Sequence, residues 1–183
     1  MGASENLLDL DFTSYVPRPS AAGGRADARA DGVIGLRGPE QGNNLIFYVK
    51  PGARVAVPLD ATALVVEDDE ITRRVLTNAL AAKGLTVRTA ADGKELQQVL
   101  RVPPLPALIL LDVGLPRVSG FRILSLLRQH PQTSAIPIIL VTASAENRDI
   151  AQGLALGADG YLSKPVSTAT LHAAVDRVLG RAA

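Results

Sequence analysis

The sequence predicts an α/β domain in which a parallel β-sheet is covered by helices on both faces. From Ala61 onward, short apolar runs alternate with segments of helical periodicity, so that five strand-helix units fit into about 120 residues. Residues 107–111 are all apolar, without the alternation of a strand that has one face in water. Both observations are typical of a doubly wound fold with its sheet at the centre.

Strands are expected where the chain is apolar and bounded by polar or turn residues. The five predicted strands lie at residues 63–66, 85–90, 107–112, 136–141 and 160–162. The third of them ends on Asp112, after which Gly114 and Pro116 turn the chain sharply. A carboxylate at the end of a buried strand is costly unless it is used, so a functional site is expected around Asp112.

Between the strands, apolar residues recur at the spacing of a helix. The five predicted helices cover residues 71–83, 93–101, 119–130, 146–156 and 168–179. Ser119 and Ser167 are of a residue type that caps helix N-termini. Gly84 and Gly157 stand where helices end, and Pro131 cannot continue the helix before it.

Residues 1–60 differ in character from the rest of the chain. Residues 1–31, rich in Pro, Ser, Ala, Gly and Arg from Pro17 onward, are expected to form a flexible arm. Residues 32–60 are expected to form a short β-rich extension or docking segment of the domain over 61–183. Its extended candidates are residues 33–36, 45–49 and 54–57, with a hairpin turn at 50–53. An unstructured leader without a role is the alternative.

Composition and charge argue against several classes of partner. With 19 basic and 18 acidic residues the net charge is +1, which offers no electrostatic footprint for nucleic acid or an anionic membrane. The chain contains no Cys, so disulfide and thiolate chemistry are excluded. Neither a secretory signal nor a membrane-spanning run is found, and a cytoplasmic location is expected.

Polar side chains stand at the carboxyl ends of four strands: Glu67, Asp68, Asp112, Thr142 and Lys164. In a flavodoxin-like strand order, 2-1-3-4-5, the first and third strands are neighbours and their ends form a crevice. Three carboxylates there repel one another unless a cation lies among them, and oxygen ligands with open positions suit Mg²⁺. Carboxylates accept phosphoryl groups, so Asp112 is the candidate nucleophile. Lys164 and Thr142 would offset charge on the phosphoryl oxygens.

The ordered set of motifs resembles the receiver domain of two-component response regulators, as in chemotaxis regulators. The resemblance covers residues 61–180 and implies that residues 61–183 form a receiver domain. The residues that carry it are Glu67, Asp68, Asp112, Pro116, Gly120, Thr142, Ala143, Tyr161, Lys164 and Pro165.

For the site, the resemblance implies that a histidine kinase or a histidine phosphotransfer protein phosphorylates Asp112. It further implies that Mg²⁺ is held by Asp68, Asp112 and the backbone carbonyl of Gly114, with Glu67 acting largely through bound water. Lys164 would contact the phosphoryl group, and its bond to the following proline would be cis.

For signalling, the resemblance implies a switch in which Thr142 moves toward the phosphoryl oxygens and Tyr161 turns inward. This movement would reshape the face of the last helix, a bistable element biased by charge. A single-domain response regulator would then signal through that face to a downstream protein effector, or form a homodimer through it. Such a protein catalyses only its own phosphorylation and dephosphorylation, so it is not expected to be an enzyme.

Other functions compete with this prediction. A receiver-fold scaffold, in which the N-terminal arm mediates binding and phosphorylation is secondary, is the main alternative. A phosphatase with a nucleophilic aspartate would need a second acid two residues after Asp112, where Gly114 stands. A transcription factor is not expected, because no helix-turn-helix follows Gly180. His130 and His172 lack metal-ligating partners at useful spacing and are expected to face solvent.

Overall fold

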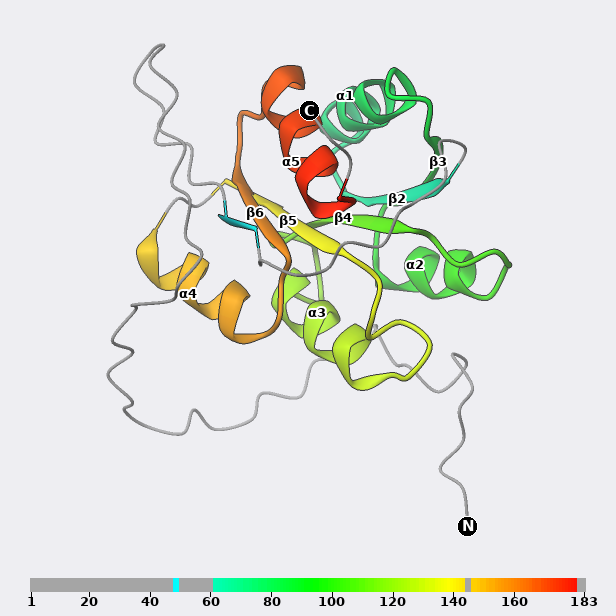
Figure 1. Cartoon of the computed structure of the whole chain (residues 1–183). Coiled ribbons are helices and arrows are strands. Elements are labelled where there is room, and N and C mark those ends of the chain that lie inside the picture. Colours follow the sequence, from blue (N-terminus) through cyan, green and yellow to red (C-terminus); the bar gives the residue numbers. More distant parts are fainter. Residues whose placement is uncertain (1–47, 50–60, 144–145, 181–183) are drawn as a thin grey trace, which may run out of the picture.

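The computed structural model describes residues 48–49, 61–143 and 146–180 (Figure 1). Within these residues one six-stranded sheet has the order β1-β6-β5-β4-β2-β3. The strands from β2 to β6 are parallel, and counting them from β2 gives the order 2-1-3-4-5. They are β2 (Thr62–Val66), β3 (Thr86–Ala90), β4 (Leu108–Asp112), β5 (Ile138–Thr142) and β6 (Gly160–Ser163). The flavodoxin-like doubly wound fold predicted from the sequence is confirmed.

Four helices connect the five parallel strands and a fifth follows the last strand, and the helix ends follow the predicted signals. They are α1 (Glu70–Ala81), α2 (Gly93–Leu100), α3 (Gly120–Gln129), α4 (Asn147–Ala155) and α5 (Thr168–Val178). Ser119 accepts a hydrogen bond from the N–H of Arg122 before α3, and Ser167 accepts one from the N–H of Thr170 before α5. Gly157 follows α4 with a φ of 91°, a left-handed conformation that L side chains rarely adopt.

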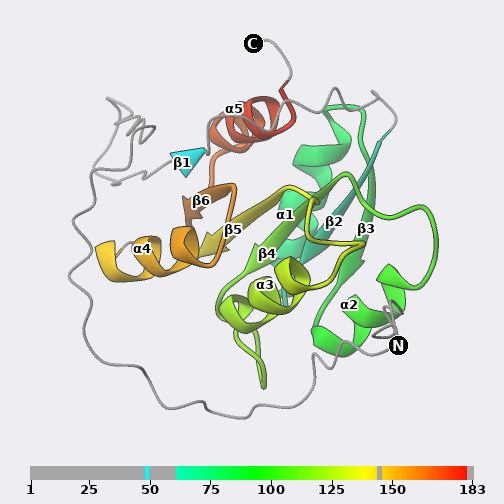
Figure 2. The ribbon, with the colours of Figure 1, turned by 60° about the horizontal axis from the view of Figure 1, so that its bottom comes forward.

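The helices lie in two layers, α1 and α5 on one face of the sheet and α2, α3 and α4 on the other (Figures 1 and 2). Successive residues of β4 point to opposite layers. Leu108 and Leu110 pack with α1 and α5, whereas Ile109 and Leu111 pack with the other three helices. Every residue of β4 and β5 is buried. A strand covered on both faces has no polar alternation, which is why this part of the sequence is continuously apolar.

A sixth strand comes from the segment that precedes the domain. β1 (Tyr48–Val49) pairs antiparallel with β6, with Tyr48 opposite Tyr161 and Val49 opposite Gly160. These two residues belong to the extended candidate over 45–49. The expected strands at 33–36 and 54–57, the turn at 50–53 and the flexible arm over 1–31 all lie outside the described residues. The boundaries 1–31, 32–60 and 61–183 stay predictions.

The expectation that both histidines face solvent is wrong. His130 is only 7% exposed after α3, and its Nδ1 accepts the N–H of Gln132 at 3.3 Å. His172 is half-buried, with Nε2 2.7 Å from the carbonyl oxygen of Ala79, which joins α5 to α1. The contacts that bury these rings arise from the turn after α3 and from helix packing, which residue spacing does not predict.

Among the described residues, every helix is too short or too polar to cross a lipid bilayer.

Candidate functional site

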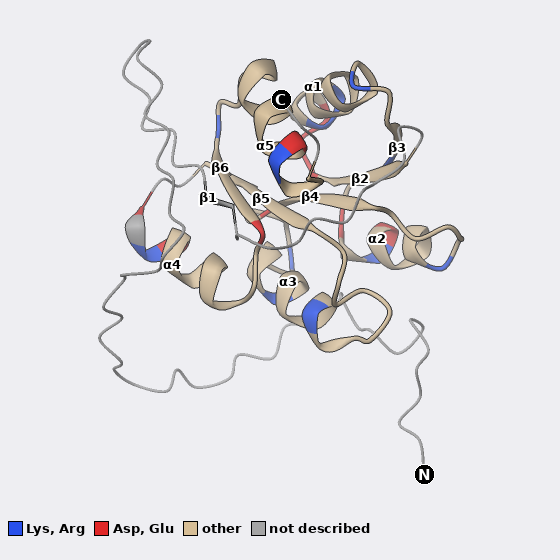
Figure 3. Ribbon diagram, in the orientation of Figure 1, with Lys and Arg blue, Asp and Glu red and all other residues tan. Residues whose placement is uncertain are grey.

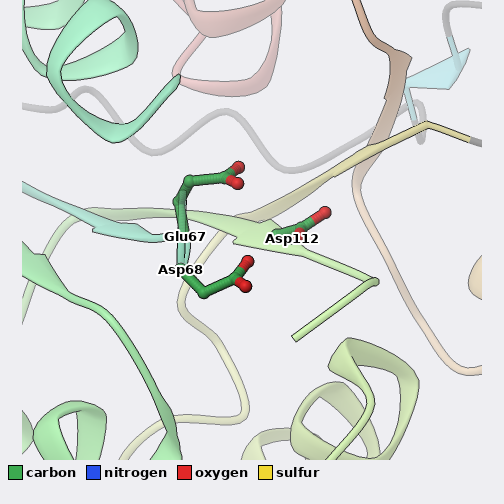
Figure 4. Close-up of side chains that lie close together, drawn as sticks. All are labelled: Glu67, Asp68 and Asp112. Carbon is green, nitrogen blue, oxygen red and sulfur yellow. The ribbon is translucent and has the colours of Figure 1, made fainter. Parts of the chain in front are cut away.

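The predicted carboxylates come together at the carboxyl ends of β2 and β4 (Figure 4). Val66 pairs with Leu111, so the residues that follow β2 lie beside the end of β4. One carboxylate oxygen from each of Glu67, Asp68 and Asp112 lies within 4.8 Å of the other two. Glu67 is 1% and Asp112 5% exposed, whereas Asp68 faces solvent. The carboxylate cluster is therefore shielded from solvent around Glu67 and Asp112 and accessible to solvent at Asp68.

Lys164 brings a cation to this cluster from the loop after β6. Its Nζ donates to Oε1 of Glu67 at 2.9 Å and lies 3.2 Å from Oδ1 of Asp112. Its backbone N–H donates to the carbonyl oxygen of Thr142 at 2.7 Å, which ties this loop to the end of β5. The Lys164–Pro165 peptide bond is cis, as the resemblance implies. Four strand ends thus contribute to one site.

Burial and mutual charge change the acidity of these groups. Burial raises the pKa of the Glu67 carboxyl, Lys164 opposes this effect, and the charges of Asp112 and Asp68 add to it. Burial by itself would lower the pKa of Lys164, but the hydrogen bond to Glu67 and the charge of Asp112 outweigh it, so the pKa is raised. Lys164 therefore stays protonated and is shared between two buried carboxylates. Negative charge is left in excess, which a divalent cation would offset.

Arg73 of α1 supports the acidic loop, although the sequence motifs do not include it. Its Nη1 donates to the carbonyl oxygens of Glu67 at 2.7 Å and Asp68 at 3.0 Å. Asp69 caps the same helix by accepting the N–H of Thr72 at 2.8 Å. A long side chain one helical turn after a loop points back toward it, and this spacing is the signal that identifies Arg73. Together these contacts fix the turn from which both carboxylates project.

Gly120 allows the loop after β4 to fold closely against Asp112. Its N–H donates to the carbonyl oxygen of Val113 at 3.0 Å. A Cβ atom at this position would lie 2.1 Å from the backbone oxygen of Asp112 and 2.8 Å from Cα of Val113. Because both are backbone atoms, no side-chain rotation relieves the overlap. The close approach of two backbone segments explains why glycine stands here.

Thr142 and Tyr161 meet beneath α4. Thr142 ends β5 and is 4% exposed, and Tyr161 in β6 is completely buried. Their side chains hydrogen-bond each other. A Cβ on Gly153 of α4 would lie 3.5 Å from Cδ2 of Tyr161 and 2.7 Å from Cδ1 of Leu140, so the helix packs directly over the ring. In this structure the tyrosine already occupies an inward position.

Comparison with known proteins now decides the family. The family model of the response regulator receiver domain matches residues 63–176, which is more than half of the 183-residue chain. The chain belongs to this family. Receiver domains of two-component systems are typically phosphorylated and bind Mg²⁺ at an acidic pocket. The resemblance in the sequence is thus confirmed.

Individual relatives agree with this family. The receiver domain is 44% identical over 118 residues to the phosphate regulon transcriptional regulatory protein PhoB of Rhizobium meliloti, covering 64% of this chain and 52% of that protein. It is 39% identical over 119 residues to the transcriptional regulatory protein GltR of Pseudomonas aeruginosa, covering 65% and 49%. The chain therefore spans about half the length of these relatives. The solved structure of chemotaxis protein CheY4 of Vibrio cholerae is 32% identical with a TM-score of 0.62, covering 66% of this chain and 99% of that one.

The donor set of this receiver domain fits Mg²⁺. All three side-chain donors are carboxylate oxygens, which hard divalent cations prefer. Nζ of Lys164 lies 2.9 Å from Oε1 and 2.8 Å from Oε2 of Glu67, so this buried carboxylate is already paired with one ammonium group. Gly114 lies beside the cluster, because a Cβ there would be 3.4 Å from Oδ2 of Asp112. A cation at this place would offset the negative charge that one ammonium group leaves among three carboxylates.

The buried tyrosine of the receiver domain has a testable acidity. Burial raises the pKa of Tyr161 to about 12, and the charge of Asp149 adds to this effect, while the hydrogen bond with Thr142 opposes it. In the unfolded chain the phenol ionises near pH 10. Between pH 10 and 12 the phenol of Tyr161 therefore ionises in the unfolded chain while it stays largely neutral in the folded chain. Because this ionisation stabilises the unfolded chain, the free energy of unfolding should fall by about 2 to 3 kcal/mol over this range.

The measurement compares the native chain with Tyr161→Phe. The difference in tyrosinate absorbance between the two proteins should have its midpoint near pH 12. From pH 10 upward the native chain should lose stability relative to Tyr161→Phe, because the phenylalanine variant has no phenol at this position to ionise. A difference midpoint near pH 10 would contradict the burial of the phenol.

Proposed function

We propose that this chain is a response regulator that accepts a phosphoryl group on Asp112 from a histidine kinase or a histidine phosphotransfer protein. The observation that carries the proposal is the sharing of one ammonium group by two buried carboxylates at the ends of β2 and β4, Lys164 with Glu67 and Asp112. Asp112 stands at the end of the central strand β4, and Gly114, which has no side chain, leaves space beside its carboxylate. Its role is that of phosphoacceptor and not of an enzyme acting on other substrates.

The proposed step is an in-line displacement at phosphorus. An Oδ atom of Asp112 forms the new P–O bond, the P–N bond to the donor histidine breaks, and the departing imidazole nitrogen takes up a proton from solvent. Lys164 stays protonated, and its ammonium group would stabilise the negative charge on the phosphoryl oxygens. Thr142, at the end of the neighbouring β5, would donate its hydroxyl to another of these oxygens.

Glu67, Asp68 and Asp112, with the backbone carbonyl of Gly114, are the proposed ligands of Mg²⁺. When bound, the ion supplies positive charge that reduces repulsion between the carboxylates and the incoming phosphoryl group. Asp68 is exposed and would hold the ion directly, whereas Glu67 is paired with Lys164 and would act through bound water. Arg73 keeps the two acidic residues in place through their carbonyl groups.

Signalling is proposed to start from the contact between Thr142 and Tyr161. If the Thr142 hydroxyl moves to the phosphoryl group, the phenol of Tyr161 loses a hydrogen-bond partner beneath α4. The ring is already inside, so the expected inward turn is not available from this conformation. The change would be transmitted to the face around α5, which binds a downstream protein effector or a second copy of the chain.

A scaffold function is the second candidate, and the pairing of β1 with β6 favours it. Here the N-terminal segment would mediate binding, and phosphorylation would be secondary. The relatives PhoB and GltR are transcriptional regulators, but the chain matches only about half of their length. With a net charge of +1, a protein partner in the cytoplasm is proposed in preference to nucleic acid or membrane.

The proposal is tested by offering acetyl phosphate and Mg²⁺ to the purified full chain. Intact-mass spectrometry should show one phosphoryl group per chain, and chelation of Mg²⁺ should lower the rate at least about tenfold. Asp112→Asn should take up none. Asp69→Asn is the matched control, because Asn also caps helices and Asp69 lies outside the cluster. A folded native chain that stays unmodified would leave only the scaffold function.

A further inference from the structure

The two outer strands of the parallel sheet are protected in different ways. β3 carries Arg88, which is partly buried, and two exposed threonines, Thr86 and Thr89. Arg88 also donates to carbonyl oxygens of the segment before β4, among them that of Val102 at 2.9 Å. Charged and polar side chains on an edge strand discourage pairing with another chain. The side chains of β3 itself therefore disfavour pairing of this edge with another strand.

β6 has no such protection in its sequence. Its four residues, Gly160–Ser163, include no charge (Figure 3). They also include no proline, and all four are buried. A strand at the end of a sheet presents a row of backbone N–H and C=O groups that can pair with a further strand. β1 takes this place, antiparallel to β6, and it also lies against α5. The edge of β6 is thus covered by a separate element.

The chain connection permits this cover without strain. Val49 lies opposite Gly160, the first residue of β6. β1 therefore ends on the side of the sheet where the parallel strands begin, which is also where Thr62 begins β2. Four strand spacings separate β1 from β2 in the sheet order, about 19 Å. The 12 residues from 50 to 61 span at most about 40 Å when extended. The chain can therefore reach its own β6 easily.

The composition of the covering segment also fits an edge-pairing role. Residues 45–49 read Leu-Ile-Phe-Tyr-Val, five consecutive residues of high β-propensity or apolar character. Such a segment is an aggregation hazard when its backbone is left without a partner. Pairing with β6 would give hydrogen-bond partners to the backbone groups of residues 45–49 and to those of the outer edge of β6.

We propose that the outer edge of β6 is a docking surface for an extended apolar segment, and that residues 45–49 of the same chain are its occupant. The surface takes its ligand by backbone pairing, as in β-strand addition, between α4 and α5. This inference is independent of phosphoryl transfer, because it depends on the sheet edge and not on Asp112.

The test uses the full chain with Tyr48→Pro and Val49→Pro together. In an antiparallel edge strand one of two successive N–H groups faces the neighbouring strand, and the double change removes it whichever it is. The probe is a fluorescent synthetic peptide of residues 44–51, measured by anisotropy. It should bind the double variant at least about tenfold more tightly than the native chain, whose edge is already occupied at high effective concentration.

Three controls make the result decisive. Ala28→Pro in the full chain should bind the probe as weakly as the native protein, and a probe carrying both prolines should bind neither. Urea unfolding and uptake of phosphate from acetyl phosphate establish that the double variant is folded. Equal binding of the probe to native and double-variant chains, or binding to neither, would overturn the proposal.

Hydrogen exchange on the native full chain gives a second readout that needs no variant. One of the amides of Tyr48 and Val49 should exchange at least about tenfold more slowly than an extended chain does, at all protein concentrations. Exchange of both amides at the rate of an open chain would overturn the proposal. Protection that appears only as sedimentation shows dimer formation would place the strand on a second copy, and the proposed occupant would be wrong.

Discussion

Replacing Gly120 with alanine should destabilise the receiver domain by about 3 kcal/mol or more, the upper end of the cost of overpacking. The new methyl group would stand 2.1 Å from the backbone oxygen of Asp112. Alanine gains at most about 1 kcal/mol of helix propensity at the start of α3, so the steric cost decides the sign. Relief of the overlap requires the loop after β4 to move, and Asp112 would move with it. Phosphoryl uptake should therefore fall together with stability.

Urea unfolding followed by circular dichroism measures the first effect, and intact-mass spectrometry after treatment with acetyl phosphate measures the second. Gly114→Ala is the matched control on the same loop. Its Cβ would meet Oδ2 of Asp112 at 3.4 Å, an ordinary van der Waals contact, and Gly114 is not among the residues with positive φ. The control should unfold within about 0.5 kcal/mol of the native chain. A Gly120→Ala protein as stable as this control would refute the close approach.

Replacing Arg128 with methionine should cost about 3 to 5 kcal/mol, the range observed when one partner of a buried ion pair is removed. Nη2 of Arg128 lies 2.6 Å from Oδ2 of Asp159, and the pair is less than one fifth exposed. The same guanidinium donates to the carbonyl oxygens of Gly157 and Ile136, each at 2.8 Å. Burial lowers the pKa of Arg128, and Asp159 opposes this effect, so the group stays charged. Its loss would open the contact of α3 with the turn after α4.

A thermodynamic cycle with Asp159→Asn separates the charge from the packing. The double variant should lose less than the sum of the two single changes, because it leaves no buried charge without its partner. Lys83→Met is the control, because Lys83 pairs with Asp176 at 2.7 Å at similar exposure but donates to no carbonyl oxygen of the residues that the structure describes. Its cost should be smaller than that of Arg128→Met by about 1 to 3 kcal/mol, because Arg128→Met also leaves carbonyl oxygens without their donor. Equal losses for Arg128→Met and Lys83→Met would show that the carbonyl contacts add little.

Much of the fold and site follows from local properties of the sequence. Continuous apolar runs predict the central strands, and the polar residues that interrupt them fall at strand ends, so Glu67, Asp112 and Lys164 are expected at one edge of the sheet. Ser119 and Ser167 mark helix starts by the chemistry of their own side chains. Each of these signals depends on neighbours within a few residues, and such signals survive folding unchanged.

Contacts between distant segments are different, because no local pattern specifies them. The burial of His130 and His172 and the contacts of Arg128 with the turn after α4 depend on which elements the fold places side by side. The pairing of β1 with β6 is of the same kind, since any exposed edge would accept an apolar strand. The sequence by itself determined the order of the elements and the chemistry of the site. Only the tertiary structure decided what holds that site in place and what covers the sheet edge, because these depend on distances between residues far apart in the chain.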